Sequence, residues 1–510
     1  MNKILIATLF LFSCSKSVEI NKPRTFPYSI KLNSTLPTNG NVSEKFQAAS
    51  DKIVYIADES TDTVDDLFVV NVDGSNRKNL TNLSIGKKVI QFVISPDKSK
   101  IAFLADISTT GFFDLYMINL DGTNLTRINQ GLTASSQTVS SNFRFTNSGN
   151  KIIYASDEIG SVRNIYIANL DGTSRTRLNT TLGVFSSFQL ANDDSRVVYR
   201  NVSSNPNVYS ANLTGTIENQ LNSNFNLTAN PAAGVQDFQI SPNSQKIVYR
   251  ANQDDGAIFE LYTINLDGSG AKTKINGSII TGGLVSSNYR FSLDSTKIVY
   301  IADSQIDEMF ELFSVNLDGT LLSKLNETLP SSGDVDSFKI SEDSLKVIYI
   351  ANQTSSNKEL YSVNMNGSNR VKINTSLQGS ESVAQFSLLG SKIFYASDIG
   401  NSGVFNIYMN DLSGSNQIKL TNATSGVGYW NNSLQTDQYS TSSSIFIGAN
   451  QGSIREIFSL DSNQIVSVQG GFGVSLATTS LGSSFIIVGN YVVYRYQTNN
   501  GYELFSSLIK

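Results

Sequence analysis

The sequence predicts an all-β fold: a single β-propeller of four-stranded antiparallel blades, with about ten repeat units in one ring or fewer in a smaller ring. Three observations predict it. A short apolar block recurs about every 49 residues through most of the chain. Five copies are followed by an Asp-Gly pair between two strand-like runs. The first and last segments are complementary parts of one repeat.

The composition excludes several classes of protein. Of 510 residues, 40% are hydrophobic and 16% charged, with a net charge of −5, which is too apolar for a disordered chain. A single cysteine excludes a disulfide framework. The absence of histidine excludes Ser-His-Asp and Cys-His nucleophiles and histidine-bearing zinc sites. We therefore predict no cofactor and no catalytic activity.

Residues 1–14 have the pattern of an export signal that ends at a lipidation site. Lys3 precedes an apolar run from Ile4 to Phe12, about half of the roughly twenty residues that a transmembrane helix needs. The segment from Leu11 to Cys14 resembles the lipobox of bacterial lipoproteins, so Cys14 is expected to carry the lipid. Ser15 implies sorting to the outer membrane. The alternative is an ordinary secretory signal with a chance cysteine.

The mature chain is predicted to begin with a polar tether over residues 15–27, and residues 28–510 form the propeller. Each unit opens with a strand such as Phe92-Val-Ile-Ser. The second strand is the recurring apolar block, which is preceded by a basic residue in eight copies: Lys52, Lys100, Lys151, Arg196, Lys246, Lys297, Lys346 and Lys392. Weaker copies lie near Ser444 and Tyr491. Because the apolar residues of this strand are consecutive, both of its faces should be buried between stacked sheets.

A hairpin completes each unit. A third strand, such as Asp114-Leu-Tyr-Met-Ile-Asn, leads to an Asp-Gly pair and then to a short polar fourth strand ending in forms such as Arg127-Ile-Asn. Asp-Gly between strands predicts a tight turn in which both residues adopt positive φ.

The two ends of the chain should pair. The segment from Ile30 to Pro37 resembles the segment from Ser323 to Pro330, which closes an internal unit. The chain therefore starts with a fourth strand, whereas the last unit, ending at Lys510, has only three strands. Pairing the ends would close the ring and remove two open strand edges.

The repeat has a recognisable family pattern. The run from Ser95 to Asp106, followed by Asp114-Leu-Tyr-Met-Ile-Asn-Leu-Asp-Gly-Thr, resembles the TolB-type, WD-like β-propeller repeat. The resemblance covers roughly residues 28 to 510. It implies the propeller fold and, commonly, a protein-binding role in the bacterial envelope. The repeat also occurs in prolyl-oligopeptidase-type peptidases, whose catalytic domain needs a histidine that this sequence lacks.

Charge is separated by segment. The ten loops between second and third strands hold 20 acidic and 6 basic residues, whereas the ten outer strands hold 12 basic and 2 acidic residues. Basic residues on outer strands protect an exposed edge from pairing with other molecules. The alternative for the basic strands, a nucleic-acid or lipopolysaccharide patch, is disfavoured because these residues are spread round the circumference.

The acidic loops form the candidate binding face. The acids are densest in the first, fifth and sixth units: Asp58, Glu59, Asp62, Asp65, Asp66, Asp254, Asp255, Asp303, Asp307 and Glu308. We predict that this face binds a cationic protein surface. Weak calcium binding is an alternative, although no loop has the spacing of a calcium hand. A structural alternative is that the Asp or Asn ending each second strand accepts hydrogen bonds from loop N–H groups and holds the turn.

These features favour a lipid-anchored envelope protein that acts as a non-catalytic scaffold. Its partners would be envelope proteins rather than nucleic acid, and it would be a monomer that meets the membrane only through its lipid. One alternative is a propeller enzyme that cleaves polysaccharide with paired carboxylates, as a glycosidase or lyase. Another is a passive surface-coat protein.

Overall fold

The structure is a computed structural model of the 510-residue chain. The residues that it describes are 29–129, 132, 137–158, 162–180, 183–225, 227–228, 230–254, 256–353, 356–419, 435–436, 444–450, 454–461, 464–467, 485–489, 491–498 and 501–508. The predicted signal peptide with Cys14, the predicted tether and Asp255 lie outside these residues.

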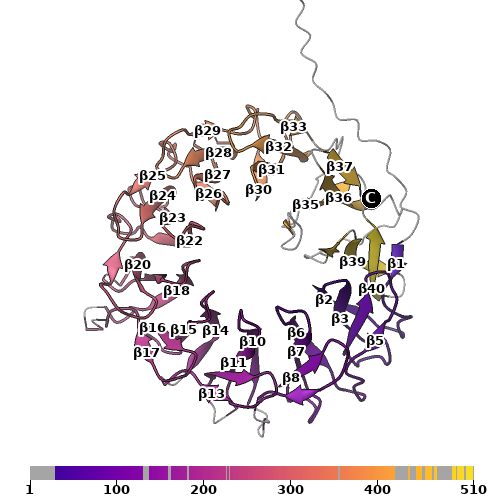
Figure 1. Ribbon diagram of the computed structural model, residues 1–510. Coiled ribbons are helices and arrows are strands. Elements are labelled where there is room, and N and C mark those ends of the chain that lie inside the picture. Colours follow the sequence, from indigo (N-terminus) through magenta and orange to yellow (C-terminus); the bar gives the residue numbers. More distant parts are fainter. Residues whose placement is uncertain are drawn as a thin grey trace, which may run out of the picture.

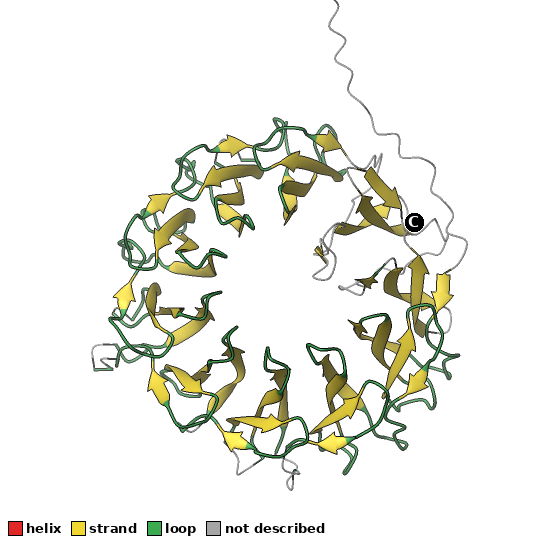
Figure 2. Ribbon diagram, in the orientation of Figure 1, coloured by secondary structure: helices red, strands yellow, loops and turns green. Residues whose placement is uncertain are grey.

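The described strands form ten four-stranded antiparallel sheets, arranged around a common axis (Figure 1). Successive sheets follow one another around the ring in chain order, as the colours of Figure 1 show. Over the described residues there is no helix (Figure 2), and none could therefore cross a membrane. We call the sheets blades 1 to 10, with β2–β5 as blade 1 and β38–β40 together with β1 as blade 10.

Each blade takes its strands in the same order, from the axis outward. The first strands are β2 (Val42–Ala49), β6 (Val89–Ile94), β10 (Val139–Phe145), β14 (Val184–Leu190), β18 (Val235–Ile240), β22 (Val285–Phe291), β26 (Val335–Ile340), β30 (Val383–Leu389), β34 (Gln435–Thr436) and β38 (Phe485–Val488). The second strands are β3 (Lys52–Ala57), β7 (Lys100–Ala105), β11 (Lys151–Ser156), β15 (Arg196–Asn201), β19 (Lys246–Ala251), β23 (Lys297–Ala302), β27 (Lys346–Ala351), β31 (Lys392–Ser397), β35 (Ser444–Asn450) and β39 (Tyr491–Thr498). The third strands are β4 (Asp66–Asn71), β8 (Asp114–Asn119), β12 (Asn164–Asn169), β16 (Val208–Asn212), β20 (Glu260–Asn265), β24 (Glu311–Asn316), β28 (Glu359–Asn364), β32 (Asn406–Asp411), β36 (Ile454–Asp461) and β40 (Gly501–Leu508). The fourth strands are β5 (Lys78–Asn79), β9 (Thr126–Arg127), β13 (Thr176–Arg177), β17 (Glu218–Gln220), β21 (Thr273–Lys274), β25 (Ser323–Lys324), β29 (Val371–Lys372), β33 (Ile418–Lys419), β37 (Gln464–Ser467) and β1 (Ser29–Lys31).

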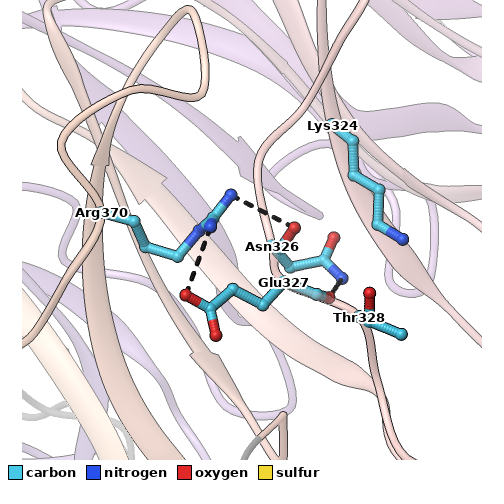
Figure 3. A pocket seen from close by; sticks show the side chains of 5 residues that line it. All are labelled: Lys324, Asn326, Glu327, Thr328 and Arg370. Carbon is cyan, nitrogen blue, oxygen red and sulfur yellow. Dashed lines mark hydrogen bonds and ion pairs between the residues drawn. The ribbon is translucent and has the colours of Figure 1, made fainter.

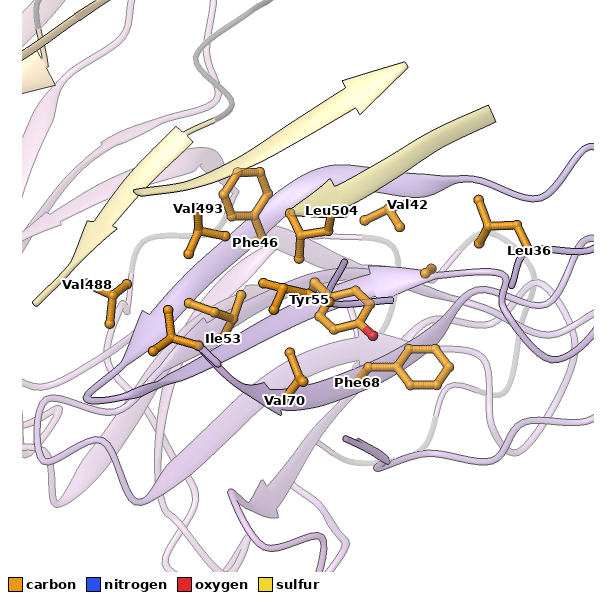
Figure 4. Close-up of a cluster of buried hydrophobic side chains, with 13 residues drawn as sticks. Leu36, Val42, Phe46, Ile53, Tyr55, Phe68, Val70, Val488, Val493 and Leu504 are labelled. Atoms are coloured by element: carbon orange, nitrogen blue, oxygen red, sulfur yellow. The ribbon is translucent and has the colours of Figure 1, made fainter. Parts of the chain in front are cut away.

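The second strands are buried on both faces, as their unbroken apolar pattern predicts. In β3, Ile53 and Tyr55 pack into a core with Val493 and Leu504 of blade 10 (Figure 4). Val54 and Ile56, which alternate with them along the strand, face the other way, into a core shared with blade 2. Blades 1 to 7 each contribute to two such cores, and burying a side chain of this size stabilises the fold by about 1.5–3 kcal/mol.

The hairpin turns differ from the predicted type. In blade 1, Gly74 has φ of 82°, but Asp73 is not in the left-handed region, so only one of the two residues adopts positive φ. The N–H of Gly74 donates to the carbonyl of Asn71 at 2.8 Å, which makes Asp-Gly the third and fourth residues of the turn. Asp73 instead accepts from the N–H of Ser75 at 2.9 Å. The prediction that both residues adopt positive φ was wrong, because the Asp73 side chain caps the N–H of Ser75 and Asp-Gly falls at the end of a longer connection.

The two ends of the chain pair, as predicted. Strand β1 is antiparallel to β40, with Ser29, Ile30 and Lys31 opposite Ser507, Ser506 and Phe505. The sheet made of β38–β40 and β1 lies against blade 1 and shares its core (Figure 4).

Polar bonds join the same two blades. The side chain of Arg495 donates to the carbonyl of Val42 at 2.7 Å. Arg200 of blade 4 donates in an equivalent way to the carbonyl of Val235 of blade 5 at 2.8 Å. The contact between blades 10 and 1 thus resembles a contact between two blades that are consecutive in the sequence.

Candidate functional site

The polar residues that end the second strands hold the neighbouring loops. Their side-chain oxygens accept the N–H of the residue just before the first strand of the same blade. The pairs are Asn41 to Asp58, Lys88 to Asp106, Thr138 to Asp157, Gly234 to Asn252, Leu284 to Asp303, Asp334 to Asn352 and Ser382 to Asp398. In Asp106 and Asp398 the second oxygen accepts a glycine N–H of the following loop, at 2.9 and 2.7 Å. The structural alternative drawn from the sequence is therefore confirmed for these positions.

A second set of acids is buried at the start of the third strands and forms ion pairs with the basic fourth strands. The pairs are Arg127 with Asp114, Lys274 with Glu260, Lys324 with Glu311, Lys372 with Glu359 and Lys31 with Glu503. The acidic side chains are 3–7% exposed.

The strand register explains these ion pairs. Lys372 stands opposite Tyr361, and Glu359 lies two residues before Tyr361 on the same face, within reach of the long lysine side chain. In these five blades, part of the charge that the sequence separates by segment is thus neutralised within the blade.

Two of the predicted site acids are part of this internal structure. Glu59, whose side chain is fully buried, accepts from the hydroxyl of Tyr55 at 2.6 Å and pairs with Arg77. Asp66 accepts from the hydroxyl of Thr81 at 2.6 Å and from the N–H of Leu83 at 2.8 Å. These carboxylates, like those of the strand-ending Asp residues, stabilise the blade rather than forming an exposed surface.

The remaining predicted acids are accessible to different extents. Asp62 and Asp65 of blade 1 are half-buried, whereas Asp254 of blade 5 and Asp307 and Glu308 of blade 6 are exposed. Figure 1 places blade 1 and blades 5 and 6 on opposite sides of the ring, so the structure does not bring the predicted acids together in one cluster.

Burial changes the titration of the blade 1 acids. The pKa of Asp58 lies above its ordinary value because burial disfavours the charged form. The pKa of Asp65 is raised by burial and, secondarily, by the negative charge of Asp58. Among the described residues, no three Asp, Glu or Cys side chains are placed to hold a metal ion.

Sequence reasoning missed the partners of the basic residues. Arg77 and Arg175 stand three residues after a hairpin glycine, and each pairs with a glutamate four residues after the tyrosine of the second strand. The periodic spacing of arginine and glutamate relative to the repeat was the available signal. This spacing identifies the ion pairs only when the alignment of the neighbouring strands is known.

The comparisons with known proteins agree with this architecture. A family model described as the TolB β-propeller domain matches residues 38–282. No curated protein matches the sequence.

Several solved structures resemble the chain at low identity. A eukaryotic initiation factor is 14% identical with a TM-score of 0.48, over 82% of this chain and 95% of that one. A protein of Agrobacterium tumefaciens described as TolB is 14% identical with a TM-score of 0.29, over 50% of this chain and 86% of that one. The tricorn protease is 12% identical with a TM-score of 0.35 over 84% of this chain, which spans only 43% of the protease. Together, the repeats and the ten sheets establish that the chain is a β-propeller, and its residues 38–282 match the TolB β-propeller domain.

Proposed function

We propose that this chain is a lipid-anchored bacterial envelope protein that binds another envelope protein without catalysing a reaction. The observation that carries the proposal is the contrast between two sets of acids. Those that end second strands or begin third strands are buried and bonded within the blade, whereas Asp307 and Glu308 are exposed on a loop of blade 6. Asp254 is exposed on a loop of the adjacent blade 5, where it also lies 3.7 Å from Lys274 of its own blade. Exposed acids on neighbouring loops suit a basic protein surface, because complementary charge speeds and orients association.

The direct test is capture of a partner from bacterial envelope membranes solubilised in detergent. The full chain is compared with a variant that carries Asp254→Asn, Asp307→Asn and Glu308→Gln. The proposal predicts that a protein captured by the unchanged chain is lost from the variant, and that capture weakens as salt rises.

A matched control removes the same number of charges from the opposite ends of the third strands. Asp121, Asp267 and Asp318 lie in hairpin turns, and each accepts the backbone N–H of the residue two positions later. In blade 7 an asparagine, Asn366, accepts the equivalent N–H of Ser368 at 3.1 Å, so an amide can replace the carboxylate there. The control variant with Asp121→Asn, Asp267→Asn and Asp318→Asn should therefore fold and keep its partner. Equal capture by the unchanged chain and both variants would contradict the acidic surface.

The lipid anchor is tested separately. In bacteria supplied with a labelled fatty acid, the full chain should incorporate the label and sediment with membranes, and Cys14→Ser should abolish both. A labelled Cys14→Ser chain, or an unlabelled original chain, would contradict lipidation while leaving partner binding to be judged by the capture experiment.

A further inference from the structure

A polar pocket of about 480 Å³ lies on the outer rim, where blades 6 and 7 meet (Figure 3). Lys324, Asn326, Glu327 and Thr328 line it from the end of blade 6, and Arg370 lines it from blade 7. Figure 3 shows the two basic side chains on either side of the segment from Asn326 to Thr328. The volume falls at the lower end of the roughly 300–1,000 Å³ typical of small-molecule sites.

Arg370 occupies a position that two other blades fill with arginine. Arg77, Arg175 and Arg370 each stand three residues after a hairpin glycine. The guanidinium groups of Arg77 and Arg175 each pair with a glutamate whose side chain is 0% exposed, Glu59 and Glu158. In those two blades a buried carboxylate neutralises the arginine from within.

Blade 7 lacks that buried carboxylate. Gln353 takes the place of Glu59, since its side-chain oxygen accepts from the hydroxyl of Tyr349 at 3.1 Å and from the N–H of Glu327 at 3.2 Å. Glu59 accepts from Tyr55 and from Ser34 in the same way. The amide of Gln353 carries no charge to balance the guanidinium.

The guanidinium of Arg370 is instead shared among weaker acceptors. It donates to the carbonyl of Leu325 at 2.7 Å and to the carbonyl of Asn326 at 3.3 Å. Its carboxylate partner is Glu327, at 3.4 Å and 55% exposed. An exposed ion pair contributes little, so another anion can displace this carboxylate at small cost.

We infer that this pocket binds a small ligand through an oxyanion, a carboxylate or phosphate group, which replaces Glu327 at Arg370. The guanidinium has five N–H donors in a planar fork that matches such groups, and the bonds above engage three of them. Lys324, which is paired with Glu311 of its own blade, lines the opposite side of the pocket, and Thr328 adds a hydroxyl at the wall, so Arg370 is the cation on which the inference depends.

The test is calorimetric titration of the full chain at low salt with inorganic phosphate, with D-glucuronate, and with uncharged D-glucose as a control. We expect saturable binding of one equivalent of at least one anion and none of glucose. Binding of phosphate alone assigns a phosphate ligand, and binding of glucuronate alone assigns a carboxylate; either supports the inference. If the original chain binds neither anion saturably, the inference is overturned.

The decisive variant is Gln353→Glu, which installs the carboxylate that Glu59 and Glu158 provide elsewhere and leaves Arg370 in place. It should weaken anion binding about tenfold or more, because a charge-assisted bond to the ligand is lost to an internal partner. Equal affinity in this variant overturns the inference. Arg370→Lys is the second variant should Gln353→Glu not fold: it keeps the charge but removes the planar fork, and should also weaken binding.

Two further variants separate the pocket from general charge effects. Arg77→Gln removes an equal charge from the rim between blades 10 and 1 and should leave anion binding unchanged. Glu59→Gln reproduces the arrangement of blade 7 at Arg77 and should add a second equivalent of bound anion. Loss of binding in Arg77→Gln, or no added equivalent in Glu59→Gln, would show that the buried carboxylate does not control anion access.

Discussion

At the scale of single residues, the hairpin glycines join one blade to the next. Gly172 has φ of 79°, and a Cβ placed on it would lie 2.7 Å from the carbonyl oxygen of Arg127 in the preceding blade. Any side chain at this position would therefore meet both backbone strain and a backbone atom that cannot move aside. The glycine serves the packing between blades as well as the turn.

This explanation predicts different costs for two glycines with similar backbone angles. Gly172→Ala should lower the free energy of unfolding by about 3 kcal/mol, combining strain with the clash. Gly111→Ala, where φ is 84° but no atom lies within 4 Å of the added Cβ, should cost about 1 kcal/mol. Urea denaturation of both variants measures the difference, and equal destabilisation would show that the contact between blades does not matter.

A buried tyrosine gives a prediction on the alkaline side. The pKa of Tyr408 is raised to about 12, first by burial and then by the nearby carboxylates of Glu381 and Asp398. Its folded-state pKa thus exceeds the unfolded value of about 10, so the folded chain retains this proton longer. The stability that Tyr408 contributes is complete below pH of about 10 and is lost as pH rises towards 12. Tyr408→Phe should make the urea midpoint fall less steeply over that window; an unchanged slope would contradict the shift.

At the scale of elements, the end of each second strand determines how the loops are held. Asp106 accepts the N–H of Lys88 at 2.7 Å and that of Gly111 at 2.9 Å, and so fastens two loops of blade 2. Asn252 and Asn352 accept the corresponding first bond in blades 5 and 7, which shows that an amide oxygen suffices for it.

Replacement of this side chain should open the loops locally. Asp106→Ala leaves two N–H groups without their acceptor and should cost about 2 kcal/mol, with faster hydrogen exchange at Lys88 and Gly111. Asp106→Asn keeps an acceptor and should exchange faster only at Gly111. Unchanged exchange at both amides in the alanine variant would contradict the proposed role.

The buried ion pairs should show strong coupling between partners. Lys372→Met leaves the carboxylate of Glu359 buried without its cation and should destabilise the chain by about 3 kcal/mol. Removing both charges with Glu359→Gln and Lys372→Met should recover most of that loss, because no uncompensated charge remains. A double variant as unstable as the sum of the single variants would show that the pair is not coupled.

Elements that depend on local sequence patterns could be predicted, whereas contacts that depend on how strands are aligned could not. Burial of Ile53 and Val54 on opposite faces could be predicted, because consecutive apolar residues in a strand require two covered faces. The conformation of the turn at Asp73-Gly74 was predicted wrongly, because the bond from the N–H of Ser75 to the Asp73 side chain favours a different turn. The pairing of Lys372 with Glu359 could not be predicted, because it depends on the register between strands.

At the scale of the whole molecule, the candidate site was harder to predict than the ring. The acidic segments lie between second and third strands, but Asp66 is the first residue of β4, and Asp58, Glu59, Asp66 and Asp303 accept hydrogen bonds within their own blades. A count of charges cannot separate a carboxylate that caps a loop from one that faces solvent. The pocket at Arg370 was missed for a related reason, since it depends on one neutral residue, Gln353, among repeats that otherwise look alike.

Closure of the ring brings together residues far apart in the sequence. The side chain of Lys31 bonds to that of Glu503, 472 residues away. A contact of this range costs more loop-closure entropy than any contact within blades 1 to 8, so we expect it to form late in folding. Strand β1 supplies three backbone positions to the sheet, and the shared core around Tyr55 and Leu504 supplies most of the apolar contact.

The most direct test of the closed ten-bladed ring is a disulfide between residues 29 and 507, whose Cα atoms face each other across β1 and β40. In a chain with Cys14→Ser, the pair Ser29→Cys and Ser507→Cys should oxidise rapidly within one molecule, and mass spectrometry should recover the linked terminal peptides. A control pair, Ser29→Cys with Ser314→Cys of β24 on the other side of the ring, should stay reduced. Failure of the first pair to cross-link, or links that join only different molecules, would contradict closure by the two ends of the chain.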